Sequence, residues 1–400
     1  MAIVSGWKVD RGRTTEIDRT GTGTATIDMI DTNHSVDPAS GNAILPGTPI
    51  ALGLGGYPVF TGYARKHDYD LYLDGTYGTA TLDCEDGFGV LTRTEMYADQ
   101  PNFIGDFGRP HWGGEYLHPI TKSSQIRFEK ALQVKHRIDL ILDQAGWPAG
   151  LREVFTGNIW LQMTKYAAGQ GALAAIWDAA EAEFPGIANC FISKDGKFVF
   201  HGRLARFNPT DPQYNITTWE CSDIPSWSAG KAVVFGMGPY GPDGDRIINQ
   251  AQCFPEGIEE FYMNDQTIRD ETSIGIHGVR PWSAENLIIG GSWLTGNDAK
   301  TECQAYAQYF IDNYAQAFTE LRNLRFKWLP PGAPYATEVN ALMSRIDISD
   351  RILLTTANGF SDYFYVEGLH YVAKPASDQY HEVVLDVDLS PATHWEIPPS

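Results

Sequence analysis

The sequence predicts a mainly β fold with an α+β insertion: two small β-barrels plus a helix-and-hairpin module. Three observations predict this fold class. Short runs with a period of two occur near both ends of the chain, helical periodicity is confined to the middle, and one strand pattern occurs twice. With 400 residues, of which 43% are hydrophobic and 12% aromatic, the chain is long enough for two to four domains with cores of their own.

Residues 1–100 are expected to form the first β-barrel. Between Gly21 and Met29, threonines alternate with Ala25 and Ile27, which places one face of a strand inward. Three more runs of this kind are separated by turns such as Asp74-Gly75, and they are Pro49–Leu54, Tyr57–Arg65 and Tyr77–Glu85. These runs are typical of a small antiparallel barrel or sandwich, which we expect residues 206–250 to complete.

Residues 101–205 are expected to hold a loop excursion followed by the α+β insertion. The stretch from Pro101 to about Pro119 is rich in Gly, Pro and aromatic residues and has no periodicity, so it predicts a loop. Apolar stripes then predict helices over residues 134–145 and 172–184, each ended by a Gly or Pro signal. The run Cys190–Phe200, with Asp195-Gly196 at its centre, predicts a hairpin.

The remaining chain is expected to link the barrels and then form the second one. Residues 251–330 carry linking strands and a helix predicted from about Asn297 to Thr319. Residues 331–400 are expected to hold the second β-barrel and a C-terminal tail, with strands over Ser344–Thr355, Phe364–Ala373 and His381–Leu389.

The two strand groups share one pattern. Ile44, Gly47, Ile50 and Leu52 have the same spacing as Ile346, Ser349, Ile352 and Leu354. The following strands match around Gly62 and Gly368, and then around Asp83 and Asp386. A recurring order of strand, turn, strand with a central glycine, and strand predicts two related barrels on either side of the insertion; a chance match of short β patterns is the alternative.

Composition excludes several classes of protein. The 30 basic and 50 acidic residues give a formal charge of -20, which opposes nucleic-acid binding but suits a channel that DNA passes without adsorbing. The five cysteines are far apart, so we expect buried thiols and neither a disulfide framework nor a zinc site. No signal peptide or long apolar run is apparent, which predicts synthesis and folding in a cytoplasm.

Patterns for catalysis and ligand binding are weak. P-loop, GxSxG and HExxH motifs are absent. A GxGxxG pattern at Gly236, Gly238 and Gly241 continues into a Gly-Pro turn, so it predicts a loop and no dinucleotide site. His111 and His118 flank a Trp-Gly-Gly-Glu sequence, and we expect this loop to pack against a partner and not to bind metal.

Acidic groups are expected to be structural. Asp243 with Asp245, and Asp31 with Asn33 and Asp37, could supply oxygen ligands to a hard cation, but they lack full EF-hand spacing and favour turns. Asp83, Glu85 and Asp86 could do acid–base work, although solvated charges at a strand end are the favoured interpretation. We therefore predict no catalytic, cofactor-binding or metal-binding residue, no cofactor, and no enzymatic activity.

The strand sequences resemble a known family. "DRTGTGTATIDMID", "ILPGTPIAL" and "VFTGY" resemble the minor tail proteins of long-tailed phages, and "RIDISDRILLTT", "YFYVEGLHY" and "HEVVLDVDLSP" resemble the final barrel of those proteins. Between them, "IHGVRPWSAENLI" and "ECQAYAQYFIDNYA" resemble the link between the two barrels. The resemblance extends over most of the chain.

This resemblance implies a baseplate-hub, or tail tip hub, fold. Two tail-tube-like barrels in one chain would let a homotrimer present six equivalent barrels to a sixfold tail tube. The implied partners are the chain itself and other tail-tip and tail-tube proteins, with DNA passing unbound and no membrane insertion. The implied location is the virion tail tip, after assembly in the host cytoplasm.

Two other functions stay open, a receptor- or carbohydrate-binding tip protein and an enzyme acting on cell-wall glycan. Hub proteins that carry a peptidase or lysozyme-like domain are longer, which puts a cell-wall-degrading role in doubt. We also expect the apolar segments Asp99–Pro119 and Val234–Pro242 to bury against neighbouring subunits.

Overall fold

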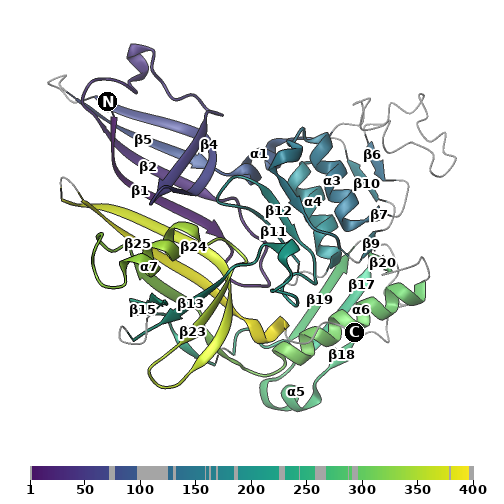
Figure 1. The fold of residues 1–400 in the computed structure, drawn as a ribbon. Coiled ribbons are helices and arrows are strands. Elements are labelled where there is room, and N and C mark those ends of the chain that lie inside the picture. The colour runs from purple at the N-terminus through teal and green to yellow at the C-terminus, as the bar shows by residue number, and fades with distance from the viewer. Residues whose placement is uncertain are drawn as a thin grey trace.

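The computed structural model describes residues 2–71, 77–96, 125–128, 132–157, 159–161, 164–167, 170–183, 188–224, 230–242, 244–256, 267–286, 288–290, 296–377 and 380–395. In these residues the prediction of a mainly β fold with an α+β insertion is confirmed (Figure 1). The predicted loop at 101–119, the Asp74-Gly75 turn, His111, His118 and Asp243 lie outside the described residues.

The first strand group is antiparallel throughout. Its strands run in the order β1 (Ala2–Gly12), β2 (Thr24–Asp31), β5 (Gly78–Glu85), β4 (Tyr57–Leu71) and β3 (Pro49–Leu54). The predicted alternation in β2 is confirmed, because Ala25, Ile27 and Met29 point into the core. β1 was not among the predicted strands, since only its second half alternates between buried and exposed positions.

The second strand group contains β23 (Arg351–Thr355), β24 (Ser361–Ser377), β25 (Tyr380–Pro391) and β22 (Asn323–Lys327). β13 (Thr218–Ser222) pairs in parallel with β23, and β14 (Ala232–Val233) and β15 (Gly236–Met237) follow at the two margins of the group. Val234 N–H donates to Ser222 O (2.9 Å), and Phe235 N–H donates to Arg325 O (2.8 Å). β13, β14 and β15 therefore extend the second group, whereas the sequence predicted that residues 206–250 complete the first.

The two groups are parts of one sheet. β1 pairs with β24 from Trp7 opposite Ala373 to Gly12 opposite Gly368, and no sheet of the described residues closes into a barrel. The expected pair of barrels is corrected accordingly. The physical reason is the length of β24, which pairs with β23 and then β1 along one edge and with β25 along the other.

A helix that the sequence analysis missed lies between the groups. α7 (Ala336–Arg345) contacts β3 and β4 of the first group and β14 and β22 of the second. Its buried Val339, Leu342 and Met343 belong to a core that both strand groups share. α7 also takes the first residues of the strand predicted over Ser344–Thr355, so β23 starts only at Arg351.

The turn before β3 and the turn before β23 have the same backbone conformation and the same hydrogen bonds. Gly47 has φ +87° and Ser349 has φ +72°. Gly47 N–H donates to Ala64 O (2.8 Å), and Ala64 N–H donates to Thr48 O (2.9 Å). In the second group the same two bonds join Ser349 to Val366 (2.8 Å) and Val366 to Asp350 (2.9 Å). Two turns with the same rare backbone conformation and the same bonds argue for a duplicated unit.

The repeat extends through a β-bulge, with a register different from the predicted one. Pairing shifts after Ala64 in β4 and after Val366 in β24, which makes Arg65 and Glu367 the inserted residues. Gly62 lies opposite Ile50 and so corresponds to Phe364, opposite Ile352, and not to Gly368. Past the bulges, Asp83 corresponds to Asp388 and not to Asp386; a two-residue difference leaves the side chain on the same face.

The insertion packs a second core beside the sheet. It contains α1 (Gly87–Arg93), α3 (Val134–Gln144), α4 (Ala172–Ala180) and a three-stranded sheet of β11 (Asn189–Ile192), β12 (Phe198–His201) and β8 (Arg152–Val154). The predicted helices and hairpin are confirmed, with Gly196 at φ +81° in the turn. Short strands complete the module, and they are β6 (Gln125–Phe128), β7 (Leu132–Gln133), β9 (Trp160–Leu161) and β10 (Thr164–Ala167).

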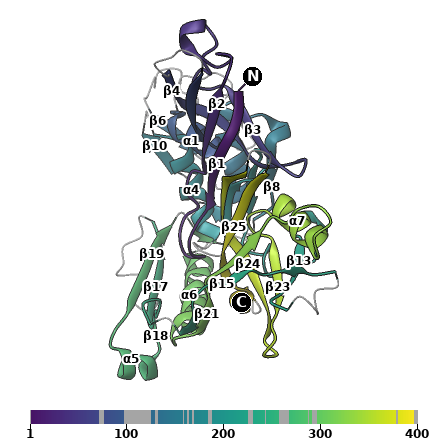
Figure 2. The same ribbon diagram turned by 90° about the vertical axis from the view of Figure 1, so that its left-hand side faces the viewer.

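The linking segment forms a lobe at the lower left in Figure 2, and its α6 shares one hydrophobic core with the helices of the insertion. α6 (Gly296–Tyr314) packs on β17 (Gln250–Pro255), β18 (Ile268–Arg269) and β20 (Ile288–Gly290), and β19 (Pro281–Asn286) pairs with β17. Trp282 stacks on Phe310 with ring centroids 4.1 Å apart. The predicted helix is confirmed but ends at Tyr314, because residues from Thr319 onward form β21 (Thr319–Leu321), paired with β16 (Tyr240–Pro242).

All five cysteines are buried and none forms a disulfide, as predicted. Within the described ranges, no helix is long and apolar enough to cross a membrane.

Candidate assembly surfaces

β3 forms an open margin of the first strand group. Among the described strands it pairs only with β4. Its counterpart β23 pairs with β24 on one edge and with β13 on the other, from Thr218 opposite Arg351 to Ser222 opposite Thr355. The repeat therefore has a strand in one copy at a position where the other copy has none, and unpaired N–H and C=O groups on such an edge can receive a further strand.

The segment Val234–Pro242 presents apolar side chains to solvent. Phe235, Met237 and Tyr240 are 44%, 48% and 57% exposed, and the Tyr240 ring contacts Phe360 at a centroid distance of 5.5 Å. This segment also holds the GxGxxG pattern, and its glycines lie in or beside β15 and β16, with no helix following. The segment is therefore exposed and apolar, but it contains two short strands where the sequence predicted a loop.

A second apolar row lies at the end of the first strand group. Ile3 of β1 lies opposite Ile30 of β2, and both are exposed, as is Leu71 at the end of β4. Asp31 and Leu71 both pair with Gly78, whereas Ile30 pairs with Thr79, so Leu71 lies on the opposite face of the sheet from Ile3 and Ile30. Exposed aliphatic side chains on adjacent strand ends mark a surface suited to protein contact.

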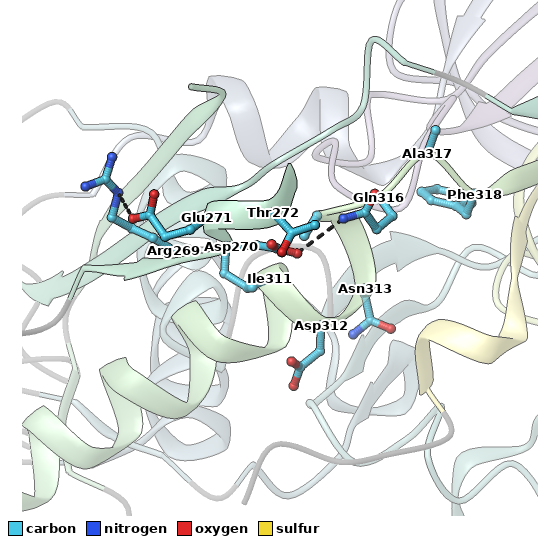
Figure 3. A pocket seen from close by; sticks show the side chains of 11 residues that line it. Arg269, Asp270, Glu271, Thr272, Ile311, Asp312, Asn313, Gln316, Ala317 and Phe318 are labelled. Carbon is cyan, nitrogen blue, oxygen red and sulfur yellow. Dashed lines mark hydrogen bonds and ion pairs between the residues drawn. The ribbon is translucent and has the colours of Figure 1, made fainter. Parts of the chain in front are cut away.

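The third surface is an open groove of about 750 Å³ between α5 (Glu271–His277) and the end of α6 (Figure 3). Its wall on the α5 side contains Arg269, Asp270, Glu271 and Thr272. The α6 side contributes Ile311, Asp312 and Asn313, and the chain that leaves α6 contributes Ala315, Gln316, Ala317 and Phe318. α5 lies at one end of the molecule (Figure 1), and the groove-lining ring of Phe318 contacts His394, which follows β25, at a centroid distance of 4.7 Å.

Inside the molecule, a charged network joins the segments around Arg13 and Arg206 to the large sheet. Glu367, the bulge residue of β24, is fully buried and accepts hydrogen bonds from Arg13 Nε (2.7 Å), Ser390 Oγ (2.6 Å) and the guanidinium of Arg206. Burial raises the pKa of Glu367, but the charges of Arg13 and Arg206 outweigh it and hold that pKa below its ordinary value. The bulge therefore aims a carboxylate at two buried cations.

A second buried network fixes the N-terminal chain against α6. Glu16 accepts a hydrogen bond from Tyr314 Oη (2.8 Å) and lies 3.4 Å from both His394 Nδ1 and Arg246 Nη1. Burial opposes ionisation of Glu16, yet His394 and Arg246 lower its pKa to about 2. Arg13 of the first network lines a cavity of only about 20 Å³, which is too small for more than a water molecule, so we interpret both networks as structural.

His201 on β12 stays neutral in the folded protein. It is buried among aromatic rings, with Nδ1 3.1 Å from Ser349 Oγ. Burial and the charge of Arg206 lower its pKa to about 3. The unfolded chain binds a proton at about pH 6.5, so the stability that neutral His201 confers is complete above that pH and is lost as pH falls toward 3.

We expect this histidine alone to remove about 2 kcal/mol of stability between pH 6.5 and 5, at about 1.4 kcal/mol per pH unit. A His201→Gln variant keeps a polar group near Ser349 and has no such proton uptake. Urea unfolding at several pH values should show a smaller loss for the variant over this range. Equal pH slopes for the two proteins would contradict the assignment. Burial raises the pKa of Asp350 to about 7, so the stability that protonated Asp350 confers is lost as pH rises. This contribution is the same in wild type and variant, and the comparison removes it.

The candidate cation ligands form a turn, as the sequence favoured. Asp31 accepts hydrogen bonds from the N–H groups of Ser35 and Val36, both at 2.9 Å, and Asp37 caps a short 3-10 helix (Pro38–Ser40) through Ala39 N–H. Across the described ranges, no group of three or more His, Cys, Asp or Glu side chains could hold a metal ion.

The carboxylates at the end of β5 are structural too, but two of them are not solvated as predicted. Asp86 is buried, caps α1 by accepting from Phe88 N–H (2.9 Å), and accepts from Gly23 N–H (2.8 Å). Glu85 is buried beneath its partner Arg93. Only Asp83 stays half-exposed. The helix α1, which the sequence analysis missed, supplies the burial that the strand pattern alone did not indicate.

The sequence matches no protein-family model and no curated protein, but the fold has counterparts among solved structures. A tail protein from Neisseria meningitidis MC58 aligns over 98% of this chain and 94% of its own, with a TM-score of 0.57 and 11% identity. The 43 kDa tail protein of prophage MuSo2 from Shewanella oneidensis aligns over 100% and 95%, with a TM-score of 0.53 and 12% identity. The chain therefore shares its fold with phage tail proteins.

Proposed function

We propose that this protein is a non-enzymatic structural component of a phage tail tip, a hub that closes or continues the tail tube and anchors other tip proteins. The observation that carries the proposal is the duplicated strand unit, with the same turn, the same pair of hydrogen bonds and the same bulge in each copy. The fold shared with two phage tail proteins supports it.

A duplicated unit has a geometric consequence in a ring. Three copies of a chain with two equivalent units present six of them, which matches a sixfold tube with a homotrimer. The open edge of β3 supports such an assembly, because its counterpart already carries an added strand. We propose that neighbouring subunits and tube proteins contact this edge, and that the acidic chain lets DNA pass without specific binding.

The proposed parts of the chain are a first strand unit (1–100), an insertion (101–205), a linking segment (251–330) and a second strand unit (331–400). Residues 206–250 join the second unit in this scheme, because β13, β14 and β15 pair there. The proposed location is the tip of the virion tail, after assembly in the host cytoplasm.

Purified tails test this function directly. Quantitative mass spectrometry of tails should find the protein in a multiple of three copies, and gold-labelled antibody should mark one end of the tail. Absence from purified tails would overturn the proposal. A protein that is present but releases sugar or peptide from cell walls would favour the enzyme, and one that binds purified wall glycan would favour a carbohydrate-binding tip protein.

The Val234–Pro242 segment gives a sharper test of assembly. We expect Met237→Glu to weaken self-association at least tenfold, since burying this side chain in an interface contributes about 1.5–3 kcal/mol. Sedimentation equilibrium measures the change. Ile276→Glu, which alters a still more exposed side chain in the linking lobe (67% against 48% for Met237), is the control and should leave association unchanged. Equal association constants for wild type and Met237→Glu would exclude this segment from the interface.

A further inference from the structure

The groove beside α5 has an apolar floor and an acidic rim. Ile311, Ala315, Ala317 and Phe318 supply apolar surface, and the lining contains three carboxylates but one guanidinium, which lies beside Glu271 (Figure 3). Just outside the groove, Ile276 and Val279 at the end of α5 are 67% and 50% exposed. Such a combination favours a ligand that is both apolar and positively charged.

α5 is held in place by polar contacts, which leaves its apolar side chains unused. Ser273 is its only buried residue, and its hydroxyl donates to Ala315 O. The buried Asn249 donates through Nδ2 to Ser273 Oγ (3.1 Å) and to Gly278 O (2.8 Å). The helix is therefore positioned without packing Ile276, and its exposed aliphatic side chains are not needed for the fold.

The rim carboxylates are poorly neutralised. Asp270 accepts from Ser273 N–H (3.0 Å) and from Gln316 (3.3 Å), both uncharged groups, and the N–H of Ser273 holds the pKa of Asp270 below its ordinary value. Asp312 contacts Gln308 (2.7 Å). The last carbonyls of α6 add partial negative charge beside Asp312. Glu271 pairs with Arg269 at 3.5 Å, where both side chains are solvent-exposed and the pair is weak.

We propose that this groove docks a segment of a partner protein in which Lys or Arg side chains alternate with aliphatic ones. The basic groups would pair with Asp270, Asp312 and the end of α6, and the aliphatic groups would cover Ile276, Val279 and the apolar floor. The inference rests on the proposed function and deepens it, because it names the kind of segment that the tip protein anchors. The site lies in the linking lobe, and its Phe318 borders the second strand unit at His394.

A short fluorescent peptide of alternating lysine and leucine, with a photo-crosslinking group, tests this proposal on the full chain. Fluorescence anisotropy at physiological salt measures affinity, and mass spectrometry locates the crosslinks. The double variant Glu271→Lys with Asp312→Lys reverses two exposed rim charges. Asp28→Lys with Asp70→Lys makes the same change in net charge on exposed strand positions of the first group and serves as the matched control. Ile276→Ser removes the aliphatic contact.

We expect the rim variant to lose at least tenfold in affinity, Ile276→Ser to lose several-fold, and the control to change less than twofold, with crosslinks in residues 267–280 and 311–318. Equal losses in rim and control variants, crosslinks elsewhere, or no binding of the peptide would each overturn the docking site. Preferred binding of a matching glutamate–leucine peptide would overturn it too. Self-association of the rim variant, measured separately, reports on the hub proposal and not on this groove.

Discussion

Glu367→Ala should lower the free energy of unfolding by about 3–5 kcal/mol, because it leaves two guanidiniums buried without their carboxylate. Glu367 is fully buried, as are the side chains of Arg13 and Arg206. Arg206 lies 4.8 Å from the ring centroids of Tyr365 and Trp395, so it has no path to solvent without unpacking them. Thermal and urea unfolding measure the effect.

Two comparisons isolate the charge of Glu367 from its volume. Glu367→Gln keeps the shape and should cost less than alanine but remain destabilising at neutral pH. The folded pKa of Glu367 is depressed, so its contribution is complete above the unfolded value and disappears as pH falls through the folded value. Wild type and Gln variant should therefore converge in strong acid. Glu382→Ala, which breaks the exposed pair with Lys327, should cost less than about 1 kcal/mol. A loss this small for Glu367→Ala would contradict the account.

Gly12→Ala should cost about 2–5 kcal/mol, the sum of a left-handed backbone penalty and a steric clash. Gly12 has φ +99°, and an added Cβ would lie 2.1 Å from Glu367 O and 2.7 Å from Gly368 Cα. The clash is with backbone, so no side-chain rotation relieves it. Because Gly12 and Gly368 are paired where β1 meets β24, the substitution separates the two strand groups at their junction.

Hydrogen exchange together with urea unfolding would measure this loss. Gly244→Ala is the control, because its Cβ would meet no atom within 4 Å and its φ is not in the left-handed region. We expect it to be neutral or slightly stabilising. If Gly12→Ala unfolds at the wild-type urea concentration, the close approach of β1 and β24 is not what joins the groups.

Local periodicity predicted much of the fold. Period-two runs located β2, β3, β4, β5, β24 and β25, and stripes such as Ile138, Ile141 and Leu142 located α3. The sequence contains no comparable pattern that shows which distant strands pair with one another. Besides β2, β1 pairs with β24, more than 350 residues away, and a strand pattern carries no information about which distant edge the strand meets.

Two missed features did have a signal. Val339, Leu342, Met343 and Ile346 have the spacing of one helix face, which indicates α7 inside the region predicted as strands. In β24 the apolar positions alternate through Phe364 and Val366 and then resume one residue late at Leu369. Such a shift by one position indicates a bulge and would have singled out Glu367. No sequence signal indicated that Asp86 and Glu85 are buried. The helix that covers them has two glycines in its first three residues, and glycine disfavours a helix.

The solution mass of the purified protein over a range of concentrations, with class averages of the same sample, tests the central claim most directly. We expect a particle of three chains with a threefold ring and six similar lobes around its centre. A chain that stays monomeric at every concentration, or a ring of two-, four- or fivefold symmetry, would contradict it.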